Sequence, residues 1–270
     1  MIYKCNSNDK SKIISYIGKD YSKCLYLYMN FLKYGIESNT ISVFIQEDKE
    51  GIQAVYLIYY SCIHVFSRHN MFSLQEFNSF LNEHVFSMIY CEKITALYIW
   101  NGLENEKRNC SSITYGWVAQ LTSHIPWESQ DVQPARKEDF RQIIEMIYAD
   151  EDIGRSYDFE SLAAQLQERN QEGYTRNLVI KDGSTVVAHA CTNAEINGLA
   201  VVAELVVNEN YRRQGRGSEI WASLCNDLLQ EGKEVFSFYY SETSRALHRK
   251  LGFHEVCEWA KIVFSSQKQG

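Results

Sequence analysis

Proline is almost absent from this sequence, because only Pro126 and Pro134 occur in its 270 residues. Proline fixes its own φ angle and restricts the preceding residue to extended conformations. The two prolines enclose a polar run at residues 127–133. We interpret this run as a linker between two domains, at residues 1–128 and 131–270.

Closely spaced cysteines are also lacking. None of the eight cysteines forms a Cys-x-x-Cys pair, and several lie within apolar runs. This pattern predicts buried free thiols in a reducing compartment and no metal site. The N-terminal residues lack the apolar core of a signal peptide, and no uncharged apolar run approaches the ~20 residues of a membrane span. We therefore expect a cytoplasmic protein without a membrane partner.

Positive charge is scarce as well, since the formal net charge is −7. Residues 131–270 contain 16 basic and 22 acidic side chains, and residues 1–130 contain 11 and 12. Neither half has the basic excess of a nucleic-acid binder, so no nucleic-acid partner is expected. The acidic balance also disfavours transfer from an aminoacyl-tRNA.

The positive charge that is present gathers in one stretch, residues 211–218, which read YRRQGRGS. The stretch follows an apolar run at 199–207 and precedes a helical pattern at 220–229. Glycine at 215 and 217 allows the backbone to approach a ligand closely. The first amides of a helix have no intrahelical partner and can bind an anion. The stretch therefore predicts a phosphate or pyrophosphate site.

Two known phosphate motifs do not fit this stretch. The Walker spacing is absent, and the third glycine of a dinucleotide fingerprint would fall at Ile220. The pattern Arg-x-x-Gly-x-Gly, residues 212–217, instead resembles the acyl-CoA pyrophosphate loop of the GNAT superfamily of N-acetyltransferases. Residues 246–253, ALHRKLGF, are similar to the downstream Leu-Tyr-x-Lys-x-Gly-Phe helix of that family. One predicted strand, 234–240, lies between them, and the resemblance covers residues 131–264.

The resemblance implies an α/β fold, with a mixed, mostly antiparallel sheet and helices on both faces. It also implies direct attack of an amine on bound acetyl-CoA, with no metal. The expected acetyl-CoA contacts are Val206, Val207, Arg212, Arg213, Gln214, Gly215, Arg216, Gly217, Ser218, Ser241 and Leu247. Ser241 stands where the family often has asparagine.

Three residues are candidate catalytic groups. Glu204 lies in an otherwise apolar strand, where burial would raise its pKa toward that of a useful base. Family members often place the acidic base further upstream, nearer Val201, so a surface charge or substrate anchor is the alternative for Glu204. His248 occupies the family's tyrosine position and is the candidate acid for the leaving thiolate, or a residue that packs against the cofactor. Tyr240 could reach the same volume.

The sequence pattern in the rest of the C-terminal half predicts both helices and strands. We expect helices at 137–148, 159–169 and 243–251 and a charged loop at 150–158. Strands are expected at 132–135, 178–180, 186–192, 199–207, 234–240 and 256–264, with turns at Asp182-Gly183 and Asn197-Gly198.

The N-terminal half predicts helices at 21–34 and 72–83 and strands at 41–46, 52–66, 85–90 and 112–121, while 95–100 is ambiguous. No phosphate loop follows this order. The half is either a degenerate GNAT copy, as in tandem members, or an unrelated α/β module, and in both cases we expect no cofactor there.

Two functions therefore remain open. The first is an acetyl-CoA-dependent N-acetyltransferase whose acceptor is a small-molecule or peptide amine. The second is an acyl-CoA-binding regulatory or scaffolding protein without turnover. The identity of the acceptor and the oligomeric state, including a homodimer, are left open by the sequence.

Overall fold

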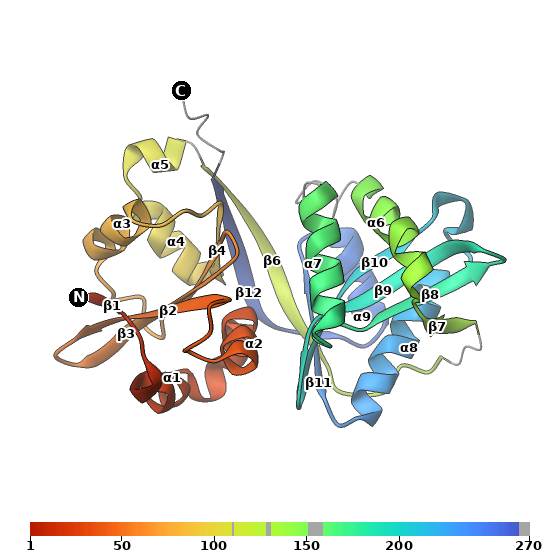
Figure 1. Cartoon of the computed structure of the whole chain (residues 1–270), viewed down its shortest axis with the longest axis horizontal. Helices are drawn as coiled ribbons and strands as arrows, with labels where there is room; N and C mark the ends of the chain where they lie inside the picture. The colour runs from red at the N-terminus through yellow and green to blue at the C-terminus, as the bar shows by residue number, and fades with distance from the viewer. Residues whose placement is uncertain (110, 128–130, 151–158, 265–270) are drawn as a thin grey trace. The chain divides into compact units, whose positions relative to one another are not determined.

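The computed structural model describes residues 1–109, 111–127, 131–150 and 159–264 (Figure 1). It divides into two compact units. Unit 1 comprises residues 1–118, 239–241 and 255–270, and unit 2 comprises residues 119–238 and 242–254. The units interleave along the chain, which differs from the single division at residues 128–131 expected from the prolines.

Unit 1 is a mixed sheet with helices on both faces. Its elements are β1 (Ile2–Lys4), α1 (Lys10–Ile17), α2 (Leu25–Tyr34), β2 (Ile41–Asp48), β3 (Gly51–Tyr59), β4 (Cys62–Phe66), α3 (Leu74–Asn82), β5 (Met88–Glu92), α4 (Lys93–Gly102), α5 (Asn105–Asn109) and β6 (Ser111–Leu121). The strand order is β1-β2-β3-β4-β5-β12-β6. The β4–β5 pair is parallel, and β1 to β4 pair antiparallel.

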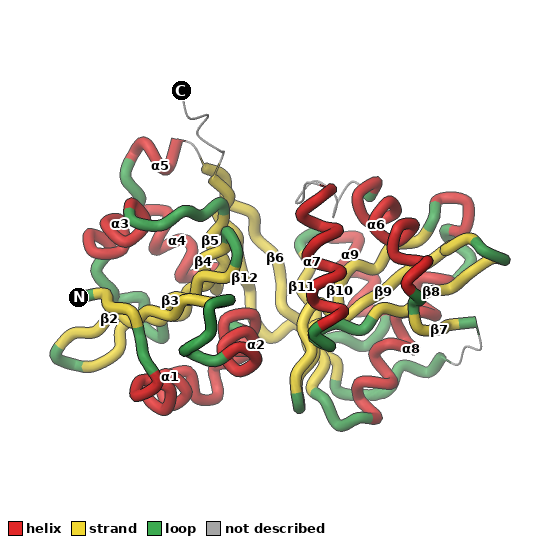
Figure 2. Tube along the Cα trace, in the orientation of Figure 1, coloured by secondary structure: helices red, strands yellow, loops and turns green. Residues whose placement is uncertain are grey.

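Alternation along β3 divides the core of unit 1 into two clusters. Val55 and Leu57 pack with α1 and α2 on one face, whereas Ala54 and Tyr56 pack with α3 and α4 on the other. Figure 2 shows the two helix pairs on opposite sides of these strands. The near-continuous apolar run of this strand is thus explained by its burial on both faces.

Elements β1, α1 and α5 were not predicted from the sequence, and two other expectations for unit 1 differ from the structure. The expected single strand 52–66 is two antiparallel strands, β3 and β4, which are joined at Tyr60 with a φ of 48°. No glycine or proline announces this turn. The ambiguous run 95–100 belongs to helix α4, which buries Thr95, Ala96 and Ile99.

Unit 2 contains the elements expected for the C-terminal half. They are β7 (Val132–Pro134), α6 (Phe140–Ala149), α7 (Phe159–Gln171), β8 (Asn177–Asp182), β9 (Thr185–Ile196), β10 (Leu199–Val207), α8 (Arg216–Gln230), β11 (Glu234–Tyr239) and α9 (Glu242–Lys250). The expected loop 150–158 lies outside the described residues except for Asp150. The strand order is β11-β10-β9-β8-β7. Only the β10–β11 pair is parallel.

The faces of this sheet are covered by different helices. Val206 of β10 packs with α6 and α7 in one apolar cluster. The neighbouring Val207 faces the opposite side, where it approaches Gly217 of α8. The mixed α/β sheet predicted for the C-terminal half is therefore confirmed.

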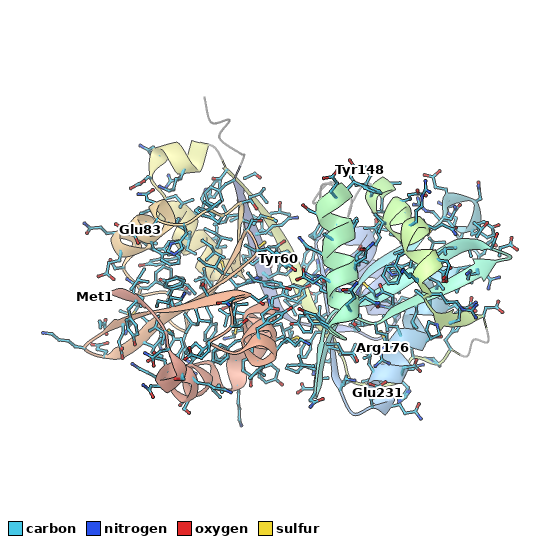
Figure 3. All side chains as sticks on the ribbon, viewed as in Figure 1. Met1, Tyr60, Glu83, Tyr148, Arg176 and Glu231 are labelled. Carbon is cyan, nitrogen blue, oxygen red and sulfur yellow. The ribbon has the colours of Figure 1, made fainter. Side chains whose placement is uncertain are left out.

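A network of charged side chains lies at the C-terminal end of α8, whereas the glycine-bearing loop lies at the N-terminal end of this helix. Arg176 donates two hydrogen bonds to Glu231, at 2.7 and 2.8 Å, and one to Glu195 at 2.7 Å. Figure 3 labels Arg176 and Glu231. Hydrogen bonds from Arg176, and then from Lys233, lower the pKa of Glu231 to about 2 against the opposing effect of burial. The network joins the starts of β8 and β11 to the end of α8.

The last strand of the chain, β12 (His254–Phe264), lies in unit 1. It pairs antiparallel with β5, from Trp259 opposite Glu92 to Val263 opposite Met88. The strand was predicted at nearly these residues, but as the closing strand of the C-terminal domain. Within the described residues, no helix combines the length and apolar character that a membrane crossing requires.

Candidate active site

The stretch 211–218 forms the turn that begins helix α8, as predicted. Gly215 is the N-cap residue, with φ 85° and ψ −10°. The amide of Glu219 donates to the Gly215 carbonyl at 3.0 Å. The amides of Arg216, Gly217 and Ser218 therefore precede the first i to i−4 hydrogen bond of the helix. These three N–H groups and the helix dipole are features that favour an anion such as a phosphate group.

The side chains of the loop have different environments. Arg212 donates from Nε to the Val207 carbonyl at 3.0 Å and is 3.8 Å from Asp150. Arg213 is exposed and has a φ of 60°. Arg216 pairs with Asp131 at 2.8 Å and with Glu219 at 3.2 Å.

Two polar residues of the loop are partly or fully solvent-facing. Gln214 is exposed and donates to the Asn210 carbonyl at 3.1 Å, and Ser218 is half-buried in the first turn of α8. Arg212 and Arg213 are exposed whereas Arg216 is half-buried, so the first two are the cations more accessible to a phosphate.

Trp127 is a neighbour of this loop that the sequence analysis missed. A Cβ built at Gly215 would lie 3.5 Å from two ring atoms of Trp127, and 42% of this residue is exposed. The indole thus covers one side of Gly215 while presenting its remaining surface to solvent. Its place beside the predicted linker gave no signal of this contact.

Strand β10 contains a β-bulge next to the loop. Ala203 pairs with Cys191 and Val206 with His189, so two residues of β10 lie opposite the single residue Ala190 of β9. Glu204, the first of the two, has a φ of 55°. A non-glycine residue in this region stores roughly 1–3 kcal/mol of strain, and such strain is concentrated at functional sites.

The same part of β10 is not paired with β11. The parallel register runs from Leu199–Glu234 to Val202–Ser237 and ends there. Ala203, Glu204 and Leu205 are partly exposed, whereas Val201 and Val202 are fully buried. The edge of β10 beyond Val202 is therefore open to an extended ligand, which could bind as an additional strand.

The backbone polar groups of Val206 and Val207, the two expected acetyl-CoA contacts on this strand, point in opposite directions. The Asn208 amide donates to the Val187 carbonyl of β9 at 2.9 Å. Because hydrogen-bonding direction alternates along an antiparallel strand, the polar groups of Val206 also face β9. Those of Val207 face the open edge. The structure thus places Val207 at this edge and turns Val206 away from it.

Glu204 lies in a partly buried polar cluster on the face covered by α7. Its Oε2 accepts from the Cys191 thiol at 3.3 Å. Burial raises the pKa of Glu204 above its usual range, while the Cys191 hydrogen bond and the charge of Arg169 act in the opposite direction. A carboxylate with a raised pKa is suited to accept a proton from an ammonium or amine.

His189 is a neighbour of this cluster. Its Nε2 is 3.1 Å from Asn177 Oδ1, and burial lowers its pKa to about 4. It is fully buried and neutral at pH 7, as a core histidine would be.

His248 is buried between β11, α8 and α9. Its Nδ1 is 2.7 Å from the Ser244 carbonyl, to which it donates, and its Nε2 is 2.8 Å from Ser237 Oγ. The ring also contacts Trp221 and Phe253 edge to face. Burial lowers the pKa of His248 to about 4. The imidazole is therefore neutral at pH 7 with both nitrogens in hydrogen bonds, which suits a packing role better than that of an acid.

Three other predicted site residues follow the end of β11 in the chain. Tyr240 and Ser241 belong to unit 1, where Lys261 Nζ lies 5.0 Å from the centre of the Tyr240 ring. Leu247 is half-buried on α9 in unit 2. The structure thus brings together the loop, β10 and Glu204 within unit 2. Across the described residues, no three His, Cys, Asp or Glu side chains form a group that could hold a metal ion.

Comparison with known proteins agrees with this geometry. Residues 137–253 match the model of the Acetyltransferase (GNAT) family. A comparison with curated protein sequences finds no match. Among solved structures, a Drosophila protein has a TM-score of 0.68 at 9% identity, and the similarity covers 97% of this chain and 98% of that one.

Two further structures carry the family name. A GCN5-related N-acetyltransferase from Sphaerobacter thermophilus has a TM-score of 0.63 at 14% identity, covering 97% of this chain and 94% of that one. A tandem GNAT protein from the clavulanic acid biosynthesis pathway has a TM-score of 0.59 at 9% identity, covering 100% and 99%. At these identities the structures show a shared fold alone, and the likeness to the tandem GNAT protein covers the whole of this chain. The sequence match and the fold together identify residues 137–253 as a GNAT acetyltransferase domain.

Proposed function

We propose that the protein is an acetyl-CoA-dependent N-acetyltransferase whose active site lies in unit 2, between the N-terminus of α8 and the open edge of β10. The observation that carries the proposal is this juxtaposition, because Gly217 of the loop approaches Val207 of the strand. A Cβ at Gly217 would lie 3.4 Å from Val207 Cγ2. In an acyl-CoA the extended pantetheine arm is attached to the pyrophosphate. The loop at the N-terminus of α8 would bind the pyrophosphate, and the adjacent open edge of β10 would bind the arm.

The residues present fit such a donor. The amides of residues 216–218 and the cations Arg212 and Arg213 would hold the pyrophosphate. The outward polar groups of Val207 would pair with an amide of the arm, and the Val207 carbonyl already accepts from Arg212. Bound acetyl-CoA supplies the thioester, which an amine can attack without a covalent enzyme intermediate.

Glu204 is the proposed base. It is one residue before Leu205, so a donor aligned along the open edge brings its acyl group to the bulge. A positioned general base contributes about 10²- to 10⁴-fold to a reaction that requires proton removal. The proposal assigns the N-acetyl transfer to this carboxylate and leaves His248 as a packing residue. A cytoplasmic location is part of the proposal, because all seven described cysteines are free thiols.

The test combines binding with turnover. Calorimetric titration with acetyl-CoA is expected to show binding by the wild-type protein and none by Gly217→Glu, whose side chain is both too large for this contact and negatively charged. Release of the CoA thiol is then measured with a panel of amines. Glu204→Gln is expected to bind acetyl-CoA normally but to lose turnover.

The outcomes separate the two functions that the sequence left open. Binding without amine-stimulated thiol release by the wild-type protein would favour a regulatory or scaffolding acyl-CoA binder. Absence of acetyl-CoA binding would contradict both functions. Equal turnover by the wild-type protein and Glu204→Gln would contradict the proposed role of the carboxylate.

A further inference from the structure

Arg169, near the end of α7, brings a cation to the sheet face that carries Glu204. Its Nη1 donates to the Oδ1 of Asn193 in β9. Asn193 is the extra residue of a second irregularity, because Val201 pairs with Ala194 and Val202 with Thr192. The guanidinium is therefore attached to β9 by a specific hydrogen bond rather than extending freely into solvent.

This attachment places Arg169 close to the proposed base. Asn193 is two residues from Cys191, the thiol of which donates to Glu204 at 3.3 Å. Burial raises the pKa values of Cys191 and Glu204, and the charge of Arg169 opposes this effect at both groups. A fixed cation and a carboxylate thus share one small region of unit 2.

The region is accessible from outside the protein. Arg169 and Glu204 are both partly exposed, and so are the residues on either side of Glu204. The pairing of β10 with β11 ends before the bulge. A ligand that reaches Glu204 along this opening therefore also comes within the field of Arg169.

We propose that the acceptor is an amine with a carboxylate close to its amino group, as in an α-amino acid, and that Arg169 binds this carboxylate while Glu204 receives the amine proton. This inference rests on the proposed acetyl transfer and specifies its substrate class. In the step itself, the acceptor nitrogen forms a bond to the acetyl carbon and the thioester C–S bond breaks. The amine proton goes to the Glu204 carboxylate, and the electron pair leaves on the sulfur of CoA.

The charge pattern explains why this class is favoured. A zwitterion has one positive and one negative group a few bonds apart, and the described part of the site offers the Glu204 carboxylate and the Arg169 guanidinium to them. The planar guanidinium matches carboxylate geometry through paired N–H donors. A peptide N-terminus lacks the adjacent carboxylate, and a polyamine would place a second cation beside Arg169. Both of these alternatives are therefore disfavoured by the site.

The experiment compares acceptors that differ only in this charge. Acetylation of glycine, leucine and phenylalanine is measured beside that of their α-carboxamides. Values of kcat/KM are expressed per unprotonated amine, because a carboxamide lowers the pKa of the amino group. The wild-type protein is expected to prefer the acids by about tenfold or more, as a single charge-assisted contact predicts.

Arg169→Gln is expected to reduce this ratio to about one, and Arg169→Lys to restore part of it. The ratio of kcat/KM for an acid to that for its carboxamide reports carboxylate binding alone. Loss of the Arg169 charge could also change the pKa of Glu204, but that change would affect the acid and the carboxamide alike. Arg141→Gln is the matched control, because this α6 side chain is 87% exposed and forms an i,i+4 ion pair with Glu145 on the surface of the helix. It should leave the ratio unchanged. Calorimetry with acetyl-CoA verifies that each variant keeps its donor site.

Two results would overturn the inference while leaving the acetyltransferase intact. One is equal use of acids and amides by the wild-type protein, and the other is an undiminished preference in Arg169→Gln. If no amine is acetylated, the proposed function fails instead. Calorimetric binding of leucine and leucinamide to the protein saturated with desulfo-CoA then decides the inference. Selective binding of leucine that Arg169→Gln abolishes supports the carboxylate site, and its absence contradicts that site.

Discussion

Replacement of Gly215 by alanine should weaken acetyl-CoA binding through backbone strain alone. Gly215 has a φ of 85°, and among the described residues a Cβ built there would meet nothing closer than the Trp127 ring at 3.5 Å. These neighbours present no steric clash, and the cost comes from the left-handed conformation, about 1–2 kcal/mol for a residue with a side chain. The strain is either retained, which lowers stability, or relieved by a shift of the turn that displaces the amides of residues 216–218.

The matched control is Gly217→Ala, two residues further on in the first turn of α8. Gly217 is within helix α8 and does not need a positive φ, and its Cβ would be 3.4 Å from Val207. Alanine in a helix interior is more stable than glycine by roughly 0.5–1 kcal/mol, which offsets this tight contact. The two variants add the same methyl group within three residues of each other, but only Gly215→Ala is expected to be unfavourable.

Differential scanning calorimetry and titration with acetyl-CoA measure the two outcomes. For Gly215→Ala, we expect a melting temperature lower by about 2–6 °C, a dissociation constant raised by about 10-fold, or a combination of both. For Gly217→Ala, both quantities should stay near the wild-type values. Equal behaviour of the two variants, or a larger loss in Gly217→Ala, would refute this account of the loop.

Three other predictions concern the base, a close contact and a charge network. Glu204→Gln should lower kcat by about 10²-fold or more at neutral pH. The defect should shrink as pH rises toward the pKa of the free amine, because a larger fraction of the acceptor is then already unprotonated. Stopped assays across the pH range measure kcat for the variant and the wild-type protein. Gly116→Ala should cost about 2–3 kcal/mol in urea unfolding, since its Cβ would lie 2.4 Å from the backbone oxygen of Tyr239, which cannot rotate away. Glu231→Gln should cost about 1 kcal/mol at pH 7, a value reduced from the full effect of its lowered pKa because 41% of the side chain is exposed. Because Arg176 lowers the folded-state pKa of Glu231 to about 2, this contribution is complete above the unfolded-state pKa near 4.5 and disappears as pH falls toward 2, so the difference between variant and wild type should vanish in acid.

Local sequence signals predicted much of unit 2. Strand β10 was predicted at its observed bounds, and the turns at Gly183 and Gly198 have the positive φ values, 59° and 82°, that such dipeptides favour. Helix α8 starts four residues earlier than the apolar pattern indicated, because its first turn consists of the polar residues 216–219. These elements are specified by residues next to each other in the chain, which explains why the sequence alone was sufficient.

Features that depend on distant pairing were not predictable in this way. The run AVVAELVV reads as a regular buried strand, so nothing in its pattern announced the bulge at Glu204. The bulge exists only relative to the register of β9. Likewise, β12 was identified as a strand from its own residues, but its pairing with β5 of unit 1 is a contact between segments about 170 residues apart. Local propensity contains no information about which edge such a strand will join.

His248 shows how a motif position can be correct while its chemistry is not what the residue type suggests. Histidine at this position invited the role of acid because its ordinary pKa is near neutrality. Burial lowers that pKa to about 4, and the hydrogen bonds to Ser244 and Ser237 engage both ring nitrogens. The departing group is a thiolate, and a thiol has a pKa of only about 8.5, so it can leave without a proton donor far more readily than an alkoxide. A site that holds the thioester and supplies one base, Glu204, is then chemically sufficient, and His248 is free to serve the packing of α9 against α8.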